Sequence, residues 1–82
     1  MFYFLHIPNY IVNDIIKSNN RGLFLREFDV EVFIDKEYYF DNRIIKSEKN
    51  DFELILIKGS KEGISLAVKY IDIYNKKVLK RN

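Results

Sequence analysis

The side chains best suited to chemistry lie in one polar loop and one aromatic stretch. The loop, Lys17-Ser18-Asn19-Asn20-Arg21, combines two cations with hydroxyl and amide groups that can contact phosphate oxygens. The stretch Tyr38-Tyr39-Phe40 is followed by two more cations, Arg43 and Lys46. Exposed aromatic rings can stack on unpaired bases, at about 1 to 3 kcal/mol per base. Side chains of these types could contact single-stranded nucleic acid.

Each of these two groups also has an ordinary structural explanation. The loop side chains can simply be solvated. The aromatic side chains can pack across the two strands of a hairpin, as cross-strand pairs commonly do. The sequence leaves both explanations open.

The remaining polar residues do not form a recognisable catalytic or metal-binding motif. His6, the only histidine, lies in an alternating apolar segment, which is more typical of a hydrogen-bonded structural residue than of a catalyst. Four carboxylates lie near one another without the glycine and the spacing of a calcium loop: Asp35, Glu37, Asp41 and Asp51. There is no Ser-His-Asp arrangement and no P-loop. We therefore expect no enzymatic activity, no metal and no cofactor.

Length and composition restrict the class of protein. The chain has 82 residues, so we expect one domain over residues 1–82. A net charge of +2 is small for a nucleic-acid-binding protein, because phosphate neutralisation supplies most of the non-specific affinity. Cysteine is absent, which fits a reducing, cytoplasmic compartment. No apolar run approaches the roughly 20 residues of a membrane span, so we expect a soluble protein with no membrane contact.

The first half of the sequence predicts a strand, two helices and a second strand. Residues 2–7 alternate as a strand, and we do not expect an export signal there because Pro8 interrupts the segment and no basic region precedes it. Asn9 is the expected N-cap of a helix that ends near Lys17. After a polar loop at 18–22, the second helix is predicted over residues 23–28 and the second strand over 30–35.

The second half predicts a hairpin, a buried strand and a long helix. Asp41-Asn42 separates two β-prone runs, so residues 36–51 are interpreted as a variable region with a hairpin. Five of the six residues in Phe52–Ile57 are apolar, which indicates an interior strand covered on part of both faces. Ser60 is the expected N-cap of the final helix. Its apolar positions recur at helical spacing: Ile64, Ala67, Val68, Ile71, Tyr74 and Val78. The pattern is α+β, with one sheet and helices packed on one face.

This order of elements resembles the type I K-homology (KH) domain from about Phe4 to Tyr74. The first half of the family's pattern contains a strand ending in Ile-Pro, a helix ending in Ile-Ile, a loop, a second helix and a strand. Ile7-Pro8, Ile15-Ile16 and Val30-Glu31-Val32 stand in the corresponding places.

The second half of the KH pattern is also present. The family has an apolar strand, a glycine, a short turn and a helix with Ala and Ile at fixed offsets. Here Leu54–Gly59 is followed by Ile64, Ala67 and Ile71. The resemblance therefore implies a KH-like β-α-α-β-(hairpin)-β-α fold, with an antiparallel sheet and helices packed on one face.

The sequence departs from the KH pattern at the family's nucleic-acid-binding loop. Family members have Gly-x-x-Gly there, and the glycines let the backbone approach the phosphates of about four nucleotides. Lys17-Ser18-Asn19-Asn20 stands at that position without a glycine, and Gly22 is displaced by two residues. Asn20 can preserve a left-handed turn, but side chains in the loop obstruct the close approach.

The resemblance also implies where a single strand would bind. The groove would lie between the first helix, the loop and the second strand, with the loop residues on phosphates. Its apolar floor would consist of Ile11, Val12, Ile15 and Val32. The alternative is that these four aliphatic residues are ordinary core.

Two functions remain open at this point. We expect a small KH-like module that binds single-stranded RNA or DNA, weakly alone or as one part of a larger ribonucleoprotein. The alternative is a protein-interaction module that has lost nucleic-acid binding, acting as an adaptor, an assembly subunit or a phage or mobile-element inhibitor. Its apolar strand edges and the exposed part of the tyrosine hairpin would then make the interface, including by strand addition to another protein or by self-association.

Overall fold

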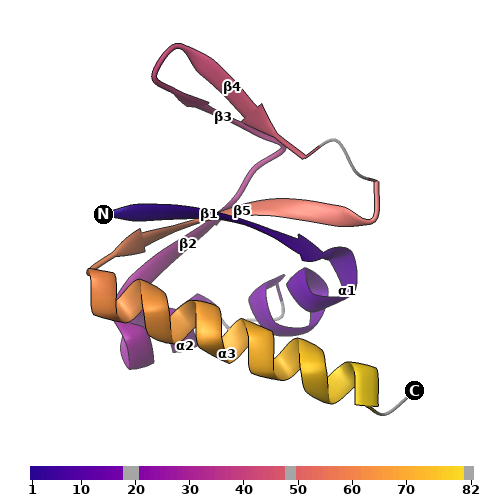
Figure 1. Cartoon of the computed structure of the whole chain (residues 1–82). Coiled ribbons are helices and arrows are strands. Elements are labelled where there is room, and N and C mark those ends of the chain that lie inside the picture. The colour runs from indigo at the N-terminus through magenta and orange to yellow at the C-terminus, as the bar shows by residue number, and fades with distance from the viewer. Residues whose placement is uncertain (18–20, 48–49, 81–82) are drawn as a thin grey trace.

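A computed structural model describes residues 1–17, 21–47 and 50–80 of the chain (Figure 1). It is an α+β fold with an antiparallel sheet and a long C-terminal helix, as the sequence predicts. The elements follow in this order: β1 (Phe2–Pro8), α1 (Asn9–Ile11), the π-helix η1 (Val12–Lys17), α2 (Arg21–Phe28), β2 (Val30–Ile34), β3 (Glu37–Phe40), β4 (Arg43–Lys46), β5 (Phe52–Gly59) and α3 (Lys61–Lys80).

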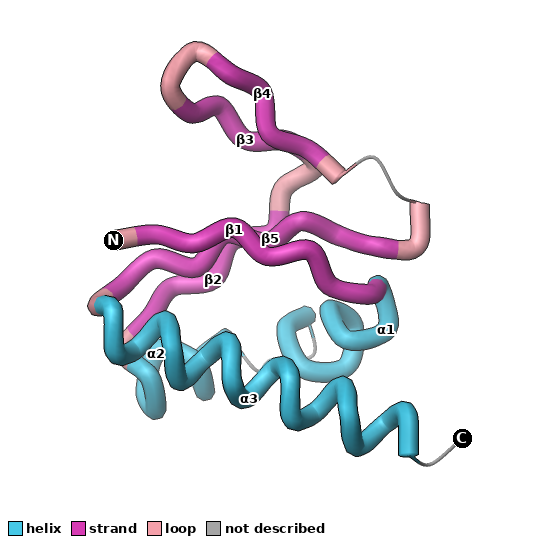
Figure 2. Tube along the Cα trace, in the orientation of Figure 1, coloured by secondary structure: helices cyan, strands magenta, loops and turns pink. Residues whose placement is uncertain are grey.

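The main sheet has the strand order β1-β5-β2, and both pairs are antiparallel. β5 is the central strand, which explains why its sequence is almost continuously apolar. Leu5 of β1 and Ile34 of β2 both lie opposite Ile55. The helices cover one face of this sheet (Figure 2). On that face Ile7, Ile55 and Ile57 are buried in the core.

The last helix begins as the sequence predicts. The Ser60 hydroxyl accepts a hydrogen bond from the backbone N–H of Gly63 at 3.0 Å, which is the bond expected of an N-cap residue. Ile64, Ala67 and Ile71 of α3 are buried against the sheet and the other helices. In the described part of the chain, no helix is both long enough and apolar enough to cross a membrane.

The first helix differs from the prediction at its N-terminus. Asn9 is the first residue of α1, and Pro8 precedes it without a side-chain capping bond, so the prediction of Asn9 as N-cap is wrong. The Asn9 amide instead donates to the carbonyl of Asn50 at 3.0 Å, and its backbone N–H donates to the carbonyl of Asp51 at 3.0 Å. These bonds tie the start of the helix to the segment before β5. The chain then continues as the π-helix η1, which ends at Lys17.

The second helix starts two residues earlier than predicted, at Arg21. It ends at Phe28, and Asp29 follows with a left-handed φ of 55°. The backbone N–H of Asp29 donates to the carbonyl of Leu25 at 3.1 Å, which closes the helix and turns the chain into β2.

The hairpin predicted around Asp41-Asn42 is present as β3 and β4. The two turn residues have φ values of 51° and 61°, as the two central positions of a type I′ turn require. Phe40 and Arg43 pair directly on either side of the turn. Asparagine and aspartate tolerate this left-handed backbone better than other non-glycine residues, which explains their presence here.

The hairpin packs on the face of the sheet that carries no helix (Figure 1). The rings of Phe4 and Tyr38 meet edge to face with centroids 5.3 Å apart, and those of Phe2 and Phe40 meet at 4.8 Å. Leu54, on the same face of β5, is 2% exposed. β5 is therefore covered on part of both faces, as its composition predicts.

The contact between α3 and the end of α2 leads to a stability prediction. A Cβ added at Gly63 would lie 2.3 Å from the carbonyl oxygen of Phe28, so Gly63→Ala should force α3 away from α2. We expect a loss of about 1 to 3 kcal/mol in the free energy of unfolding, as for other overpacked sites. Urea denaturation followed by circular dichroism measures it.

Gly22→Ala is the matched control, because a Cβ at Gly22 meets no heavy atom within 4 Å. Alanine in α2 should leave the stability unchanged or raise it by up to about 1 kcal/mol. Equal effects of the two substitutions would contradict the proposed close contact at Gly63.

Candidate nucleic-acid interface

An open pocket of about 590 Å³ lies where the end of η1, the end of β2 and the start of β5 meet. Lys17 comes from η1, and Asp35 and Lys36 follow β2. Ser47 and Asn50 precede β5, and its first residues complete the wall. Chain segments that are distant in sequence thus supply cations, a hydroxyl and an amide to one opening. Groups of these types can contact phosphate and sugar oxygens.

The charges around this pocket offset one another. Lys17 Nζ lies 3.2 Å from Glu53 Oε1, and the two side chains are 47% and 28% exposed. Lys36 and Asp35 add one charge of each sign to the rim. A partly exposed ion pair of this kind contributes little to stability, but it lowers the positive potential that Lys17 presents to a phosphate. The pocket is therefore polar without being strongly basic.

The predicted loop residues fall largely outside this geometry. Ser18, Asn19 and Asn20 lie outside the described residues, as does the side chain of Arg21. The backbone of Arg21 begins α2. Lys17, the remaining member of the predicted loop, lies at the pocket.

The four aliphatic residues predicted as an apolar floor lie in the core between the helices and the sheet. Each is at most 8% exposed: Ile11, Val12, Ile15 and Val32. All four belong to the cluster that also contains Ile55 and Ile57. Their burial leaves little surface for a base, and the alternative that they are ordinary core residues fits this structure.

Tyr38 connects the hairpin to the sheet. Its side chain is buried, and its hydroxyl accepts a hydrogen bond from the backbone N–H of Asp35 at 2.9 Å. The same oxygen lies 2.8 Å from the carbonyl of Phe33 and 3.2 Å from that of Leu54, so its proton has two acceptors. This ring packs inside the protein and is not available to stack on a base.

Tyr39 and Arg43 are the accessible members of the predicted aromatic and basic group. Tyr39 is 77% exposed, and its hydroxyl donates to Glu37 at 3.2 Å. Tyr39 pairs with Ile44, whereas Arg43 pairs with Phe40. Since alternate residues of a strand point to opposite faces, Tyr39 and Arg43 lie on opposite faces of the hairpin. The structure therefore does not bring them into one cluster.

Several residues of the pocket could not be found by sequence reasoning. Lys36 and Asn50 fall inside the predicted variable region 36–51 without a motif around them, and Glu53 belongs to the predicted interior strand. The pairing of Lys17 with Glu53 joins positions 36 residues apart. Among the described residues, no group of three histidine, aspartate or glutamate side chains is placed to hold a metal ion.

The Tyr38 hydroxyl gives a prediction with a close control. Tyr38→Phe leaves the N–H of Asp35 and the carbonyl of Phe33 without this partner, and we expect a loss of about 1 to 3 kcal/mol in the free energy of unfolding. Tyr39→Phe removes a hydroxyl from an exposed ring in the same strand and should change it by less than about 0.5 kcal/mol. Thermal and urea denaturation of both variants test this. A Tyr38→Phe protein as stable as the parent would contradict the anchoring role.

Comparisons with known proteins do not add to this picture. The chain matches no protein-family model, and no curated protein matches it. The chemistry available to the pocket follows from its own side chains and from the strands and helices around it.

Proposed function

We propose that this chain is a KH-like module that binds single-stranded RNA or DNA. The observation that carries the proposal is the arrangement of the main sheet. The strand order is β1-β5-β2, both pairs are antiparallel, and the helices cover one face. Together with the Ile7-Pro8, Ile15-Ile16 and Gly59 positions noted in the sequence, this arrangement supports the resemblance to the KH family.

The pocket between η1, β2 and β5 is the proposed binding site. It opens beside the end of η1, which precedes the segment that corresponds to the family's phosphate-binding loop. Lys17 and Lys36 would contact phosphates there, and Ser47 and Asn50 would contact sugar or base edges. The exposed ring of Tyr39 lies in β3, which begins directly after Lys36, and is available to stack on a base.

The same geometry explains why we propose weak binding. Glu53 and Asp35 offset the two lysines, so few counterions are released when a strand binds. Such a module gains affinity when it is one part of a larger ribonucleoprotein, because linked sites raise the effective concentration. A reducing, cytoplasmic location fits a chain without cysteine. We propose a binding role rather than an enzymatic one.

Fluorescence anisotropy with randomised labelled single strands tests the proposed site. The Lys17→Ala/Lys36→Ala variant should bind more weakly, and the slope of log Kd against log salt should fall by roughly 1.4, the value for two lost phosphate contacts on a single strand. Glu53→Gln should bind more tightly, because it frees Lys17 from its ion pair.

The matched control is Lys58→Ala/Lys77→Ala, which removes the same charge from two exposed positions that do not line the pocket. It should keep most of the affinity. Equal losses in the two double variants would show only a general charge effect. If the parent chain leaves RNA and DNA strands unbound at low salt, the proposal is wrong.

A second candidate is the protein-interaction module that the sequence left open. The observation that favours it is the outer edge of β1, which is apolar and pairs with no other described strand. An unpaired edge of this kind is a ready template for another strand.

A further inference from the structure

The outer edge of β1 carries backbone groups that pair with none of the described strands. The backbone N–H of Gly59 donates to the carbonyl of Met1 at 3.0 Å, which fixes the alternation of hydrogen bonds along this antiparallel pair. Tyr3, Leu5 and Ile7 consequently direct their backbone groups toward β5. The backbone groups of the alternate residues, Phe2, Phe4 and His6, point away from the sheet. No described strand pairs with them.

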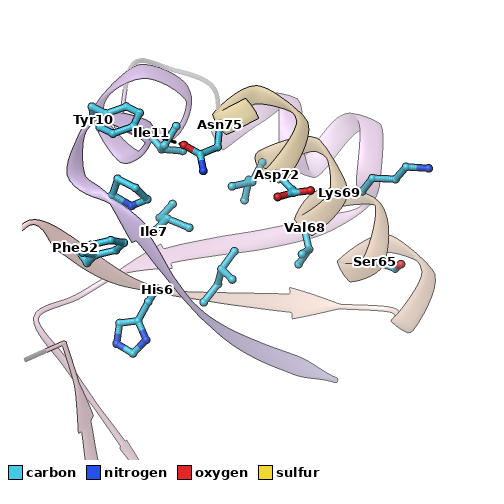
Figure 3. A pocket seen from close by; sticks show the side chains of 13 residues that line it. His6, Ile7, Tyr10, Ile11, Phe52, Ser65, Val68, Lys69, Asp72 and Asn75 are labelled. Carbon is cyan, nitrogen blue, oxygen red and sulfur yellow. Dashed lines mark hydrogen bonds between the residues drawn. The ribbon is translucent and has the colours of Figure 1, made fainter. Parts of the chain in front are cut away.

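A groove runs between β1 and α3 along this edge. One part, of about 660 Å³, lies between the Leu5–Tyr10 segment and the middle of α3 (Figure 3). The other part, of about 370 Å³, lies between residues 1–3 and the first turns of α3. Ser65 and Val68 line both parts, so the two form one continuous feature. We call it the β1–α3 groove.

The walls of the β1–α3 groove are largely apolar. Leu5, Ile7 and Val68 line it, and in Figure 3 the Ile7 side chain points inward while the His6 ring points away. At the far end, the Tyr10 hydroxyl donates to Asn75 Oδ1 at 2.6 Å, which joins α1 to α3. The groove thus combines an apolar lining with unpaired backbone groups on its rim.

We propose that the occupant of this edge is a second copy of the same chain, joined by antiparallel pairing of β1 with β1. This inference rests on the protein-interaction candidate above and names its partner. A two-fold axis at Phe4 places Phe2 opposite His6 of the second copy and Phe4 opposite itself. In that register every outward-pointing N–H and carbonyl of Phe2, Phe4 and His6 gains a partner. Pro8, which has no N–H, lies just beyond the last pair.

Charges on α3 match the same two-fold axis. The residues shared by the two parts of the groove, Ser65 and Val68, mark the level of Phe4 on this helix. Lys61 lies four residues before Ser65 and lines one part, and Asp72 lies four residues after Val68 and lines the other. A two-fold rotation reverses the second helix, so Lys61 of each copy faces Asp72 of the other. Asp72 also pairs with Lys76 of its own helix at 3.1 Å, but both side chains are exposed, and such an i,i+4 pair is weak enough for the carboxylate to accept a second cation. This charge complementarity favours a second copy over an unrelated peptide, which would not be expected to supply it.

The sequence of β1 also lacks the usual protection of an edge strand. Natural edges carry lysine, charged inward residues or bulges that prevent pairing. From Phe2 to Ile7 there is no lysine, arginine or carboxylate, and the polar groups are the Tyr3 hydroxyl and the His6 ring. The edge pairs regularly with β5 from Phe2 to Pro8, without a bulge. An apolar edge strand of this kind is protected from aggregation when another strand pairs with it.

The proposed dimer leaves the candidate nucleic-acid interface open. β1 and β2 are the two opposite edges of the sheet, and the pocket with Lys17 and Lys36 lies beside β2. Self-association and nucleic-acid binding therefore use different sheet edges and different charged residues, although Phe52 lies between the two openings. The two properties can succeed or fail independently. Each has its own variants.

Sedimentation equilibrium of the untagged chain over a range of concentrations tests the dimer. We expect a reversible equilibrium between the 9.9 kDa chain and a species of twice that mass. Lys61→Glu and Asp72→Lys should each raise the dimer dissociation constant by about fivefold to tenfold, because each reversal sets like charges opposite one another twice per dimer. The combined Lys61→Glu/Asp72→Lys protein should recover most of the parent affinity.

Two further variants separate the interface from general effects. Lys77→Glu, a reversal at an exposed position of α3 outside the groove, should leave the dissociation constant unchanged. His6→Pro removes one outward N–H from an exposed residue and should raise it by about tenfold, since two hydrogen bonds are lost per dimer. Anisotropy with labelled single strands, run on the same samples, reports the nucleic-acid site separately.

Several outcomes would overturn the proposal. A chain that stays monomeric at the highest concentration would exclude a second copy. If the dissociation constant does not change in the charge-reversal variants, or if the double variant does not restore it, the interface lies elsewhere. A monomer that binds an added apolar peptide along β1 would identify a different occupant. None of these results would alter the expectation for the Lys17 and Lys36 variants.

Discussion

The burial of β5 on both faces is the constraint on which the rest of this structure depends. Its backbone pairs with β1 on one side and β2 on the other. Toward the helices, Ile55 and Ile57 contact the core formed with α3 and the N-terminal helices. On the opposite face Leu54 lies under the hairpin, and the hydroxyl of Tyr38 reaches its carbonyl. An 82-residue chain has only a small core. A strand with neighbours on both edges and on both faces buries much apolar surface with few residues. The other two strands of the sheet pair with β5, and the helices and the hairpin pack on its two faces.

The parts of the fold that follow from nearby residues could be predicted. Ser60 next to a helical apolar pattern marks the start of α3, and Asp41-Asn42 marks the hairpin turn, because in both cases a few consecutive residues determine the local backbone. The parts that depend on distant partners could not. Asn9 is of a residue type that favours the N-cap position, but its side chain and its backbone N–H bond to residues 50 and 51 instead of capping the helix. Lys17 was expected to be free for phosphates and is instead paired with Glu53. Neither partner is visible from the local sequence.

The candidate interface shows the same division between local and distant information. The sequence identified residue types suited to nucleic acid, but it did not predict which of them would be exposed. Tyr38 and Tyr39 are adjacent and chemically alike. Tyr38 is buried with its hydroxyl in contact with three backbone groups, whereas Tyr39 is 77% exposed. Strand alternation explains why neighbours differ, but only the packing of the hairpin on the sheet decides which of the two is inside. The composition of a binding surface is thus a weaker guide than its position in the fold.

The pairing of the first strand with the last also affects how this protein is made. Phe2 lies opposite Lys58, and the whole of β1 is paired through residues 52–58. During synthesis β1 leaves the ribosome before β5 and cannot pair with it until residues 52–58 have followed. Contacts between residues so far apart form slowly, because a long loop must close before they can stabilise the chain. The apolar stretch Phe2–Ile7 therefore stays without its partner strand until β5 has been made, and during that time a chaperone or a neighbouring nascent chain can bind it.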